Sequence, residues 1–277
     1  MCETRPYPGP GTPPSSFREP PPTMCGIVGI VSSQPVNQQV YDALLLLQHR
    51  GQDSTGIATA EGSTLHMQKA KGQVREAYRT RDMRNLPGNM GLGHVRYATK
   101  GNASNEEEAQ PFYVNAPYGI TLVHNGNLTN TRELTAELFT IDRRHLNTSS
   151  DTELLVNVLA NELQAQISGT DLDVDQLFNA IARLHERVEG SYAAIALIAG
   201  HGLLAFRDPF GIRPLVLGRR QTGFTGEEWI VASESLVLEA SGYEVVRDVA
   251  PGEAVFITPD GQMVSRQCAQ NSVLIPC

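Results

Sequence analysis

A cysteine directly after a second methionine is the strongest chemical signal in this sequence. Met24 and Cys25 follow a 23-residue segment that holds eight of the 17 prolines. A cysteine that opens a strand is most often a small buried apolar residue. If Cys25 becomes the first residue, however, its α-amino group, with a pKa of about 7.7–8.0, can accept the proton of a thiol of pKa about 8.5. We therefore predict that Cys25 is a nucleophile whose own amine must be free.

An asparagine and a glycine could stabilise the charge that such a nucleophile creates. They lie in the segment HNGNLTN, residues 124–130. The side-chain amide of Asn125 and the backbone N–H of Gly126 could both donate to one developing oxyanion. The same Asn-Gly pair is also typical of an ordinary turn at a strand end. The residues alone leave both interpretations open.

Two charged residues could hold the ends of a free amino acid. Arg96, in the segment GHVRYATKG, could bind a carboxylate with two parallel hydrogen bonds, and Thr99 would add a hydroxyl. Asp151, in the first turn of a predicted helix, could hold an ammonium group, although an acid there also complements the helix dipole. His49 and Arg50, in LQHRGQDSTG, could simply be basic residues at the end of a helix.

Strands and helices must position these residues. Apolar spacing predicts a strand over 25–32, helices over 36–50, 149–163 and 174–190, and a hairpin over 56–69. Ser150 and Glu153 occupy capping-box positions at the start of the second helix. The remaining apolar segments predict strands over 91–99, 118–126, 192–200, 202–208, 213–218 and 229–233, and a hairpin over 252–267. The pattern indicates an α+β fold without a repeated β-α-β unit.

Composition excludes several classes of protein. The formal net charge is -8, which argues against nucleic acid or an anionic membrane surface as the main partner. No apolar run approaches the roughly 20 residues that span a bilayer, and the N-terminus lacks a secretory pattern, so we expect a cytoplasmic protein. The cysteines at 2, 25, 268 and 277 show no metal-binding spacing, so no metal site is expected. We interpret residues 1–23 as a disordered, proline-rich leader.

Several long motifs, in this order, closely resemble one family. The segments CGIVGI, LQHRGQDSTGI, MGLGHVRYATKG, EAQPFYVNAPYGITLVHNGNLTN, NTSSDTELL and AFRDPFGIRPLVLG are similar to the glutaminase half of the glutamine phosphoribosylpyrophosphate amidotransferases. The resemblance extends over residues 24–277. It implies a class II, N-terminal-nucleophile glutamine amidotransferase with a four-layer αββα sandwich of mixed or antiparallel sheets.

The resemblance also implies roles for single residues. The nucleophile falls on Cys25, and the oxyanion hole falls on Asn125 and Gly126. Arg96, with Thr99 nearby, would bind the α-carboxylate of glutamine, and Asp151 would hold its α-amino group. Arg50 would belong to a mobile loop that closes over glutamine.

The implied reaction is hydrolysis of glutamine to glutamate and ammonia. In the family, ammonia passes to a phosphoribosyltransferase domain that uses phosphoribosyl pyrophosphate and Mg²⁺ to make 5-phosphoribosylamine for purine synthesis. We expect the glutaminase domain at residues 24–262 and a linker to that second domain, which we do not find in the sequence, from 263–277. No cofactor is expected in this part, and the intact protein is expected to be a homo-oligomer.

Two other functions stay open at this point. With its leader retained, the chain could bind glutamine without turnover. It could also be the glutaminase of another class II amidotransferase, such as glucosamine-6-phosphate synthase or asparagine synthetase, although EAQPFYVN and FRDPFGIRPLVLG are not expected in those relatives in this form.

Overall fold

The structure, a computed structural model, describes residues 24–97, 108–167, 169, 171–222 and 226–273. Three of the sequence-based predictions fall outside these ranges. They concern the leader at 1–23, Thr99, and the end of the linker at 274–277.

Two sheets form the middle of the molecule, and every strand pairing found in the described residues is antiparallel. The seven-stranded sheet has the order β11 (Glu244–Asp248), β9 (Val216–Gln221), β10 (Glu227–Ala232), β1 (Gly26–Val31), β4 (Met90–Arg96), β2 (Ser54–Glu61), β3 (Thr64–Lys71). The six-stranded sheet has the order β13 (Met263–Gln267), β12 (Glu253–Ile257), β8 (Gly202–Arg207), β7 (Gly190–Ile198), β6 (Ile120–Leu128), β5 (Phe112–Val114).

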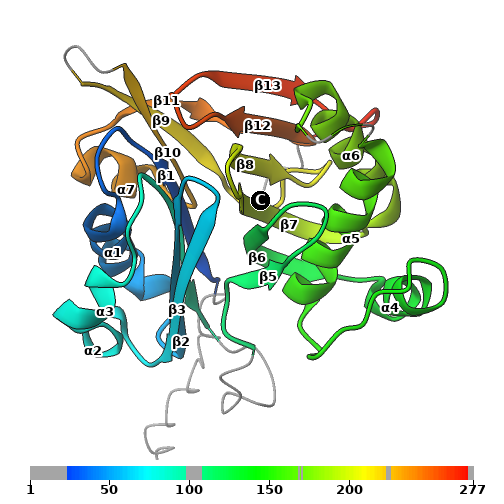
Figure 1. Cartoon of the computed structure of the whole chain (residues 1–277), viewed down its shortest axis with the longest axis horizontal. Coiled ribbons are helices and arrows are strands. Elements are labelled where there is room, and N and C mark those ends of the chain that lie inside the picture. Colours follow the sequence, from blue (N-terminus) through cyan, green and yellow to red (C-terminus); the bar gives the residue numbers. More distant parts are fainter. Residues whose placement is uncertain (1–23, 98–107, 168, 170, 223–225, 274–277) are drawn as a thin grey trace, which may run out of the picture.

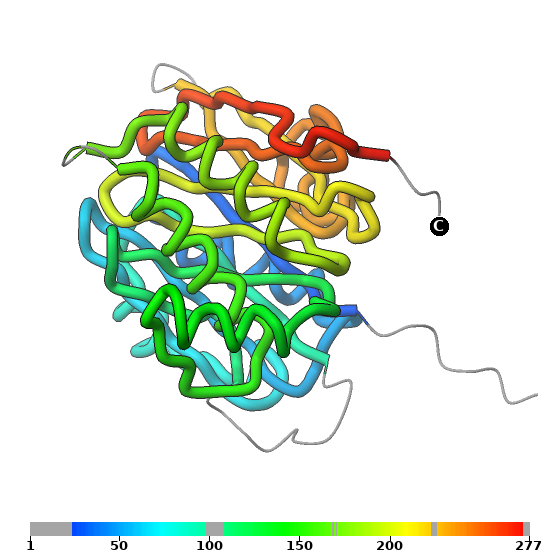
Figure 2. Tube along the Cα trace, turned by 90° about the vertical axis from the view of Figure 1, so that its right-hand side faces the viewer, coloured from blue at the N-terminus to red at the C-terminus, as the bar shows by residue number. Residues whose placement is uncertain are grey.

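Helices cover the outer face of each sheet (Figure 1). The seven-stranded sheet carries α1 (Asn37–Leu46), α2 (Val74–Ala77), α3 (Thr80–Arg84) and α7 (Ser235–Ala240), and the six-stranded sheet carries α4 (Thr131–Thr140), α5 (Asp151–Gln166) and α6 (Val174–Arg187). Figure 2 shows this second helical layer from its outer side. One apolar core fills the space between the sheets, and one lies under each helical layer. The predicted αββα sandwich is confirmed.

The side chains of β1 explain why it lies in the middle of the fold. All six of its residues are buried. Ile27 and Val31 face the other sheet, whereas Val28 and Ile30 pack under α1, as the two-residue period of a strand requires. A Cβ on Gly29 would lie 2.7 Å from a methyl group of Ile195, so glycine permits the close approach of the two sheets at this point.

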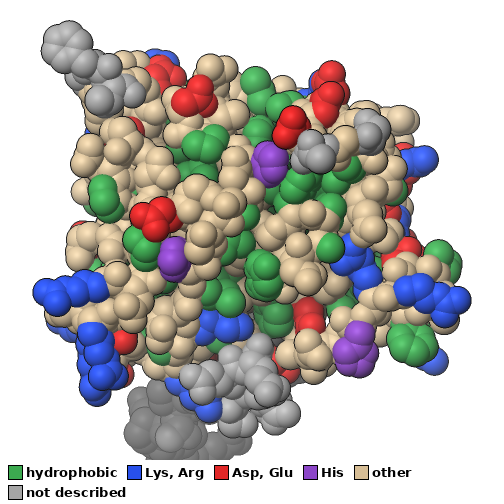
Figure 3. Space-filling view, viewed as in Figure 1, with side chains coloured by type: hydrophobic (Ala, Val, Ile, Leu, Met, Phe, Trp, Pro, Cys, Tyr) green, Lys and Arg blue, Asp and Glu red, His purple; other side chains and the backbone are tan. Residues whose placement is uncertain are grey.

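The two shortest helices contribute little to the core. α2 and α3 bury only Val74 among their residues, while Arg75, Arg81 and Arg84 stand in their last turns. Figure 3 shows basic side chains gathered over this corner of the molecule, at the lower left. This basic cluster is therefore a solvated face of two short helices within an acidic protein.

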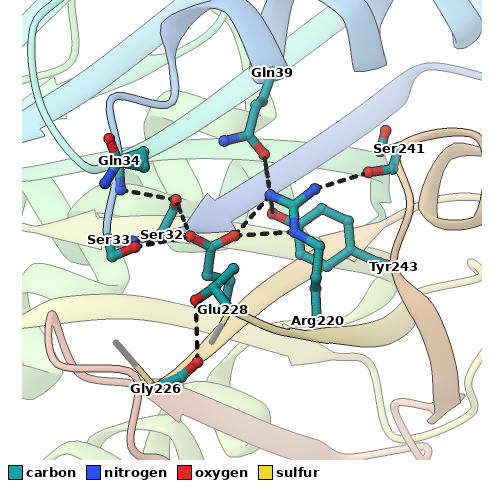
Figure 4. A network of polar contacts seen from close by, with 10 residues as sticks. Ser32, Ser33, Gln34, Gln39, Arg220, Gly226, Glu228, Ser241 and Tyr243 are labelled. Carbon is teal, nitrogen blue, oxygen red and sulfur yellow. Dashed lines mark hydrogen bonds and ion pairs between the residues drawn. The ribbon is translucent and has the colours of Figure 1, made fainter. Parts of the chain in front are cut away.

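A buried ion pair ties one edge of the seven-stranded sheet together (Figure 4). Glu228 of β10 pairs with Arg220 of β9 at 2.6 Å and accepts a hydrogen bond from Ser32, which follows β1. Arg220 also donates to Gln39 of α1 and lies 4.3 Å over the ring of Tyr243, which precedes β11. One carboxylate and one guanidinium thus join three strands and a helix.

The structure corrects one of the sequence-based predictions. Glu153 does not complete a capping box with Ser150, because its carboxylate accepts hydrogen bonds from the backbone of Asn147 and Thr148 in the preceding loop. Ser150 itself caps α5, as predicted, by accepting from the N–H of Thr152. The hairpin predicted over 252–267 is present, because β13 pairs with β12.

Candidate functional site

Five of the seven predicted site residues line one cavity. The cavity has a volume of about 820 Å³, and its walls include Cys25, Arg96, Asn125, Gly126 and Asp151. These residues come from three strands or strand ends and one helix. Arg50 does not line the cavity, and Thr99 lies outside the described residues.

Strand alternation explains how residues from two sheets meet. In β4, Leu92 faces the space between the sheets, so His94 and Arg96 follow on the same face, and Arg96 ends the strand. In β6, Val123 faces that space too, and Asn125 follows it on this face. The cavity therefore lies at one end of the space between the two sheets.

The amide of Asn125 is an unpaired donor in this cavity. Asn125 is 2% exposed, and its Nδ2 atom has no hydrogen-bond partner among the described residues. A buried donor without an acceptor costs about 1–3 kcal/mol, so such a group is typical of a functional site. The oxyanion-hole role that the resemblance implies for Asn125 requires a free donor of this kind.

Only glycine fits at position 126. Gly126 has a φ of +153°, and a Cβ there would lie 1.9 Å from the carbonyl oxygen of Ser191 in the paired strand. The same Cβ would lie 2.8 Å from Nε2 of His124. Any side chain would therefore push β6 away from β7 and displace the backbone next to Asn125.

Gln110 fixes the strand that carries Asn125. Its side-chain carbonyl accepts from the N–H of His124 at 2.6 Å, and its amide donates to the carbonyl of His124 at 3.1 Å. β5 pairs with β6 only as far as Leu122, and these two hydrogen bonds from Gln110 satisfy the backbone of β6 further along the strand, at His124. The segment EAQPF contains this glutamine, but the sequence analysis assigned it no role, because its contact depends on the path of a loop.

Asp151 is held between α5 and β6. Its carboxylate accepts from the N–H of Leu128 at 3.3 Å and lies 3.7 Å from Nδ1 of His124. It is the first residue of α5, where the helix dipole favours an anion. Burial lowers the pKa of His124, while the charge of Asp151 opposes this shift.

Arg96 already has an acidic partner in the cavity. Its NH2 lies 2.9 Å from the carboxylate of Glu108, and about four fifths of each side chain is buried. Glu108 also accepts a hydrogen bond from Ser149. Glu108 was not among the predicted site residues, although it stands in the same EAQPF motif as Gln110.

Arg50 contacts the backbone of Cys25. Its Nε donates to the carbonyl oxygen of Cys25 at 2.9 Å, and its NH1 pairs with Glu234 at 2.5 Å. Arg50 is 8% exposed and lies in the short helix η1 (Gln48–Arg50). In this structure it holds the residue expected to be the nucleophile, which differs from the loop closure that the resemblance implies.

Cys25 has a thiol in an unfavourable setting for ionisation. Burial raises its pKa, and the charge of Asp151 adds to this, while the N–H of Tyr97 and the guanidinium groups of Arg96 and Arg50 oppose the rise. A thiol with a raised pKa needs a proton acceptor before it can attack a carbonyl carbon. The nitrogen of Cys25 is joined to Met24, which also lines the cavity.

Two features are absent from the described ranges. No group of three or more histidine, cysteine, aspartate or glutamate side chains there is arranged to hold a metal ion. None of the helices described combines the length and the hydropathy of a membrane span.

Comparisons with known proteins identify the family of the chain. A family model described as a glutamine amidotransferase domain matches residues 94–240. The chain is 54% identical over 255 residues to the amidophosphoribosyltransferase of Escherichia coli K12, covering 92% of this chain and 50% of that protein. It is 48% identical over 238 residues to the amidophosphoribosyltransferase of Schizosaccharomyces pombe, covering 84% and 44%.

A solved structure has the same fold. It is a glutamine phosphoribosylpyrophosphate amidotransferase from B. subtilis complexed with ADP and GMP, with a TM-score of 0.73 and 30% identity over 90% of this chain and 50% of that one. The chain thus spans about half the length of the relatives that it matches.

Proposed function

The chain belongs to the glutamine amidotransferase domain family, and on this basis we propose that it is a cysteine-dependent glutaminase, the ammonia-producing part of an amidophosphoribosyltransferase. One observation carries the proposal. Cys25, an unpaired amide donor on Asn125, a cation and an anion all line the same cavity, although they come from separate elements.

The charges of the cavity suit free glutamine. Arg96 binds the α-carboxylate with its planar, two-pronged guanidinium, and Asp151 binds the α-ammonium group. Because Arg96 pairs with Glu108 in the structure, the incoming carboxylate has to share Arg96 with Glu108 or replace it. The side-chain amide of glutamine then extends toward Cys25.

The reaction proceeds in two halves through a thioester. The free amine of Cys25 takes the thiol proton, and the thiolate attacks the side-chain carbonyl carbon of glutamine. Asn125 and the N–H of Gly126 donate to the oxyanion, and the proton passes to the nitrogen that leaves as ammonia. Water then attacks the γ-glutamyl thioester, the amine accepts a proton from this water, and glutamate leaves with the thiol restored.

This mechanism requires cleavage between Met24 and Cys25. An amide nitrogen has no basic lone pair for the thiol proton, and the raised pKa of Cys25 makes an acceptor necessary at neutral pH. We propose that the active form begins at Cys25.

The rest of the proposed activity belongs to the whole protein. Ammonia would pass to a phosphoribosyltransferase domain, which would use phosphoribosyl pyrophosphate and Mg²⁺ to form 5-phosphoribosylamine in purine synthesis. The similarity to named amidophosphoribosyltransferases supports this part. The homo-oligomer and the cytoplasmic location expected from the sequence remain part of the same proposal.

Glutamate release by the wild-type protein and by Cys25→Ala tests the proposal. Intact mass should show that activity follows the population that begins at Cys25, and a chloroketone analogue of glutamine should label that thiol. We expect Cys25→Ala to lose at least about a thousandfold in turnover. Cys268→Ala is the matched control, because Cys268 is the other cysteine described and lies outside the cavity.

Two results would contradict the proposal in different ways. If Cys25→Ala retained turnover, Cys25 would not be the nucleophile. Glutamine binding without turnover, in protein that begins at Cys25, would favour the silent binding module instead.

A further inference from the structure

Arg213 is a second arginine in the same cavity, and the proposed mechanism gives it no role. It lies in the loop that runs from β8 in the six-stranded sheet to β9 in the seven-stranded sheet. Its Nε atom is buried without a hydrogen-bond partner among the described residues. It belongs to the motif AFRDPFGIRPLVLG, to which the sequence analysis assigned no function.

The loop is held rigidly without the help of the Arg213 side chain. The buried carboxylate of Asp208 accepts from the N–H groups of Phe210 at 2.9 Å and Ile212 at 3.2 Å. Arg207, also buried, donates from Nε to the carbonyl oxygen of Arg213 at 2.6 Å. The backbone of Arg213 is therefore fixed, and its guanidinium is not needed to fix it.

The other charged side chains that line the cavity already have partners. Arg96 pairs with Glu108, and Asp151 contacts His124 and the N–H of Leu128. Within the described residues, the guanidinium of Arg213 has neither an ion pair nor a hydrogen bond. A partly buried cation without a partner is unfavourable, so the arrangement points to an anionic ligand.

The position of Arg213 indicates which end of a ligand it meets. Its charge acts on His124, where it adds to the effect of burial in lowering the pKa of that ring. The ring of His124 lies 3.7 Å from the carboxylate of Asp151. Arg213, His124 and Asp151 all line this cavity, in which Asp151 would hold an ammonium group. In an α-amino acid the carboxylate is attached to the same carbon as that group.

We propose that Arg213 binds the α-carboxylate of the substrate together with Arg96. The inference rests on the proposed function, because it takes glutamine as the ligand. It explains how the carboxylate can bind while Arg96 keeps its contact with Glu108. It also predicts specificity, since a site with two guanidinium groups selects an amino acid with a free α-carboxylate over an amide or a peptide.

Calorimetric titration with glutamine tests this inference. The protein carries Cys25→Ala, so that binding is measured without hydrolysis. We expect Arg213→Gln to raise the Kd for glutamine by about tenfold to a hundredfold, because a hydrogen-bonded charge pair is lost. Arg213→Lys should recover part of this loss, since it restores the charge but not the planar fork. Arg219→Gln, at a half-exposed arginine of β9, is the matched control and should bind as tightly as the parent.

Glutaminamide, in which an amide replaces the α-carboxylate, separates binding from a structural role. Arg213→Gln should change the Kd for glutaminamide by less than about twofold, because the group that Arg213 contacts is missing. Unchanged glutamine binding in Arg213→Gln, or no recovery in Arg213→Lys, would overturn the inference while the proposed function stands. If the Cys25→Ala protein failed to bind glutamine at all, the inference on Arg213 and the proposed glutaminase function would both be wrong.

Discussion

The side chain of Arg50 touches the backbone of the proposed nucleophile. It donates to the carbonyl of Cys25 and pairs with Glu234, which also contacts His49. A carbonyl held in this way restricts the direction of the adjacent Cα–Cβ bond, and so limits the positions that the sulfur can take. These contacts predict that Arg50 positions the thiol, whereas the resemblance implies a residue that binds glutamine.

Steady-state kinetics of Arg50→Gln distinguish these roles. We expect kcat for glutamine hydrolysis to fall about tenfold to a hundredfold with KM changed by less than about threefold, because the thiol is displaced but the substrate ends are still bound. Arg75→Gln, at an exposed arginine of α2, controls for loss of a positive charge. A rise in KM with unchanged kcat would instead support the substrate-binding role.

At the scale of elements, the ion pair between β9 and β10 holds the side of the sandwich opposite the six-stranded sheet. The side chain of Glu228 is 3% exposed, and hydrogen bonds from Ser32, Ser33 and Arg220 surround it. Burial alone would raise the pKa of Glu228, but these hydrogen bonds lower it below its usual value. The ionised carboxylate is therefore a stable part of the fold.

Denaturant unfolding of Glu228→Ala measures how much this network stabilises the protein. We expect a loss of about 2–4 kcal/mol, because Arg220 and two serines lose a buried acceptor. Glu244→Ala removes an exposed partner of Arg219 on the neighbouring strand and should change stability by less than about 1 kcal/mol. Equal losses in the two variants would show that the network contributes no more than a surface pair.

Periodicity predicted the elements with long apolar faces. In α6, for example, Leu177, Ile181 and Leu184 recur at helical spacing, and all three are buried. The elements that were missed are short or mostly exposed: α4 buries only Leu134 and Leu138, and β5 has three residues. β11, which alternates between exposed and half-buried residues on a sheet edge, was missed for the same reason.

The candidate site was predictable in part. Cys25, Arg96 and Asp151 stand next to or within strong elements, and the resemblance supplied their roles. Gln110 and Arg213 lie on loops, where no period indicates the direction of a side chain. The positions of these two side chains depend on how the two sheets approach each other, which only the assembled sandwich determines.

At the scale of the whole molecule, buried histidines link stability to pH. Burial lowers the pKa of His185 to about 4, and burial together with the nearby charges of His124 and Arg96 lowers that of His94 to about 3. In the unfolded chain a histidine binds a proton near pH 6.5. Between that pH and these lower values the unfolded state binds more protons, so the free energy of unfolding falls as the pH falls.

Unfolding at pH 7 and pH 5 tests this link. We expect the wild-type protein to lose more stability over this interval than His94→Gln, by about 2 kcal/mol, since one neutral buried ring no longer contributes. His145→Gln, at an exposed histidine, should keep the wild-type difference. An identical loss in wild type and His94→Gln would mean that His94 does not remain neutral in the fold.

The order of strands leaves four sheet edges, and each is shaped to resist association with a foreign strand. The register of β11 shifts between Val245 and Arg247, and β5 is only three residues long. Lys69 of β3 turns toward the six-stranded sheet and donates to the carbonyl of Ala109, and β13 carries Arg266. Irregular, short and charged edges discourage the continued pairing that leads to amyloid-like aggregates. Edges of this kind therefore limit strand-to-strand pairing of a sandwich that buries three apolar layers.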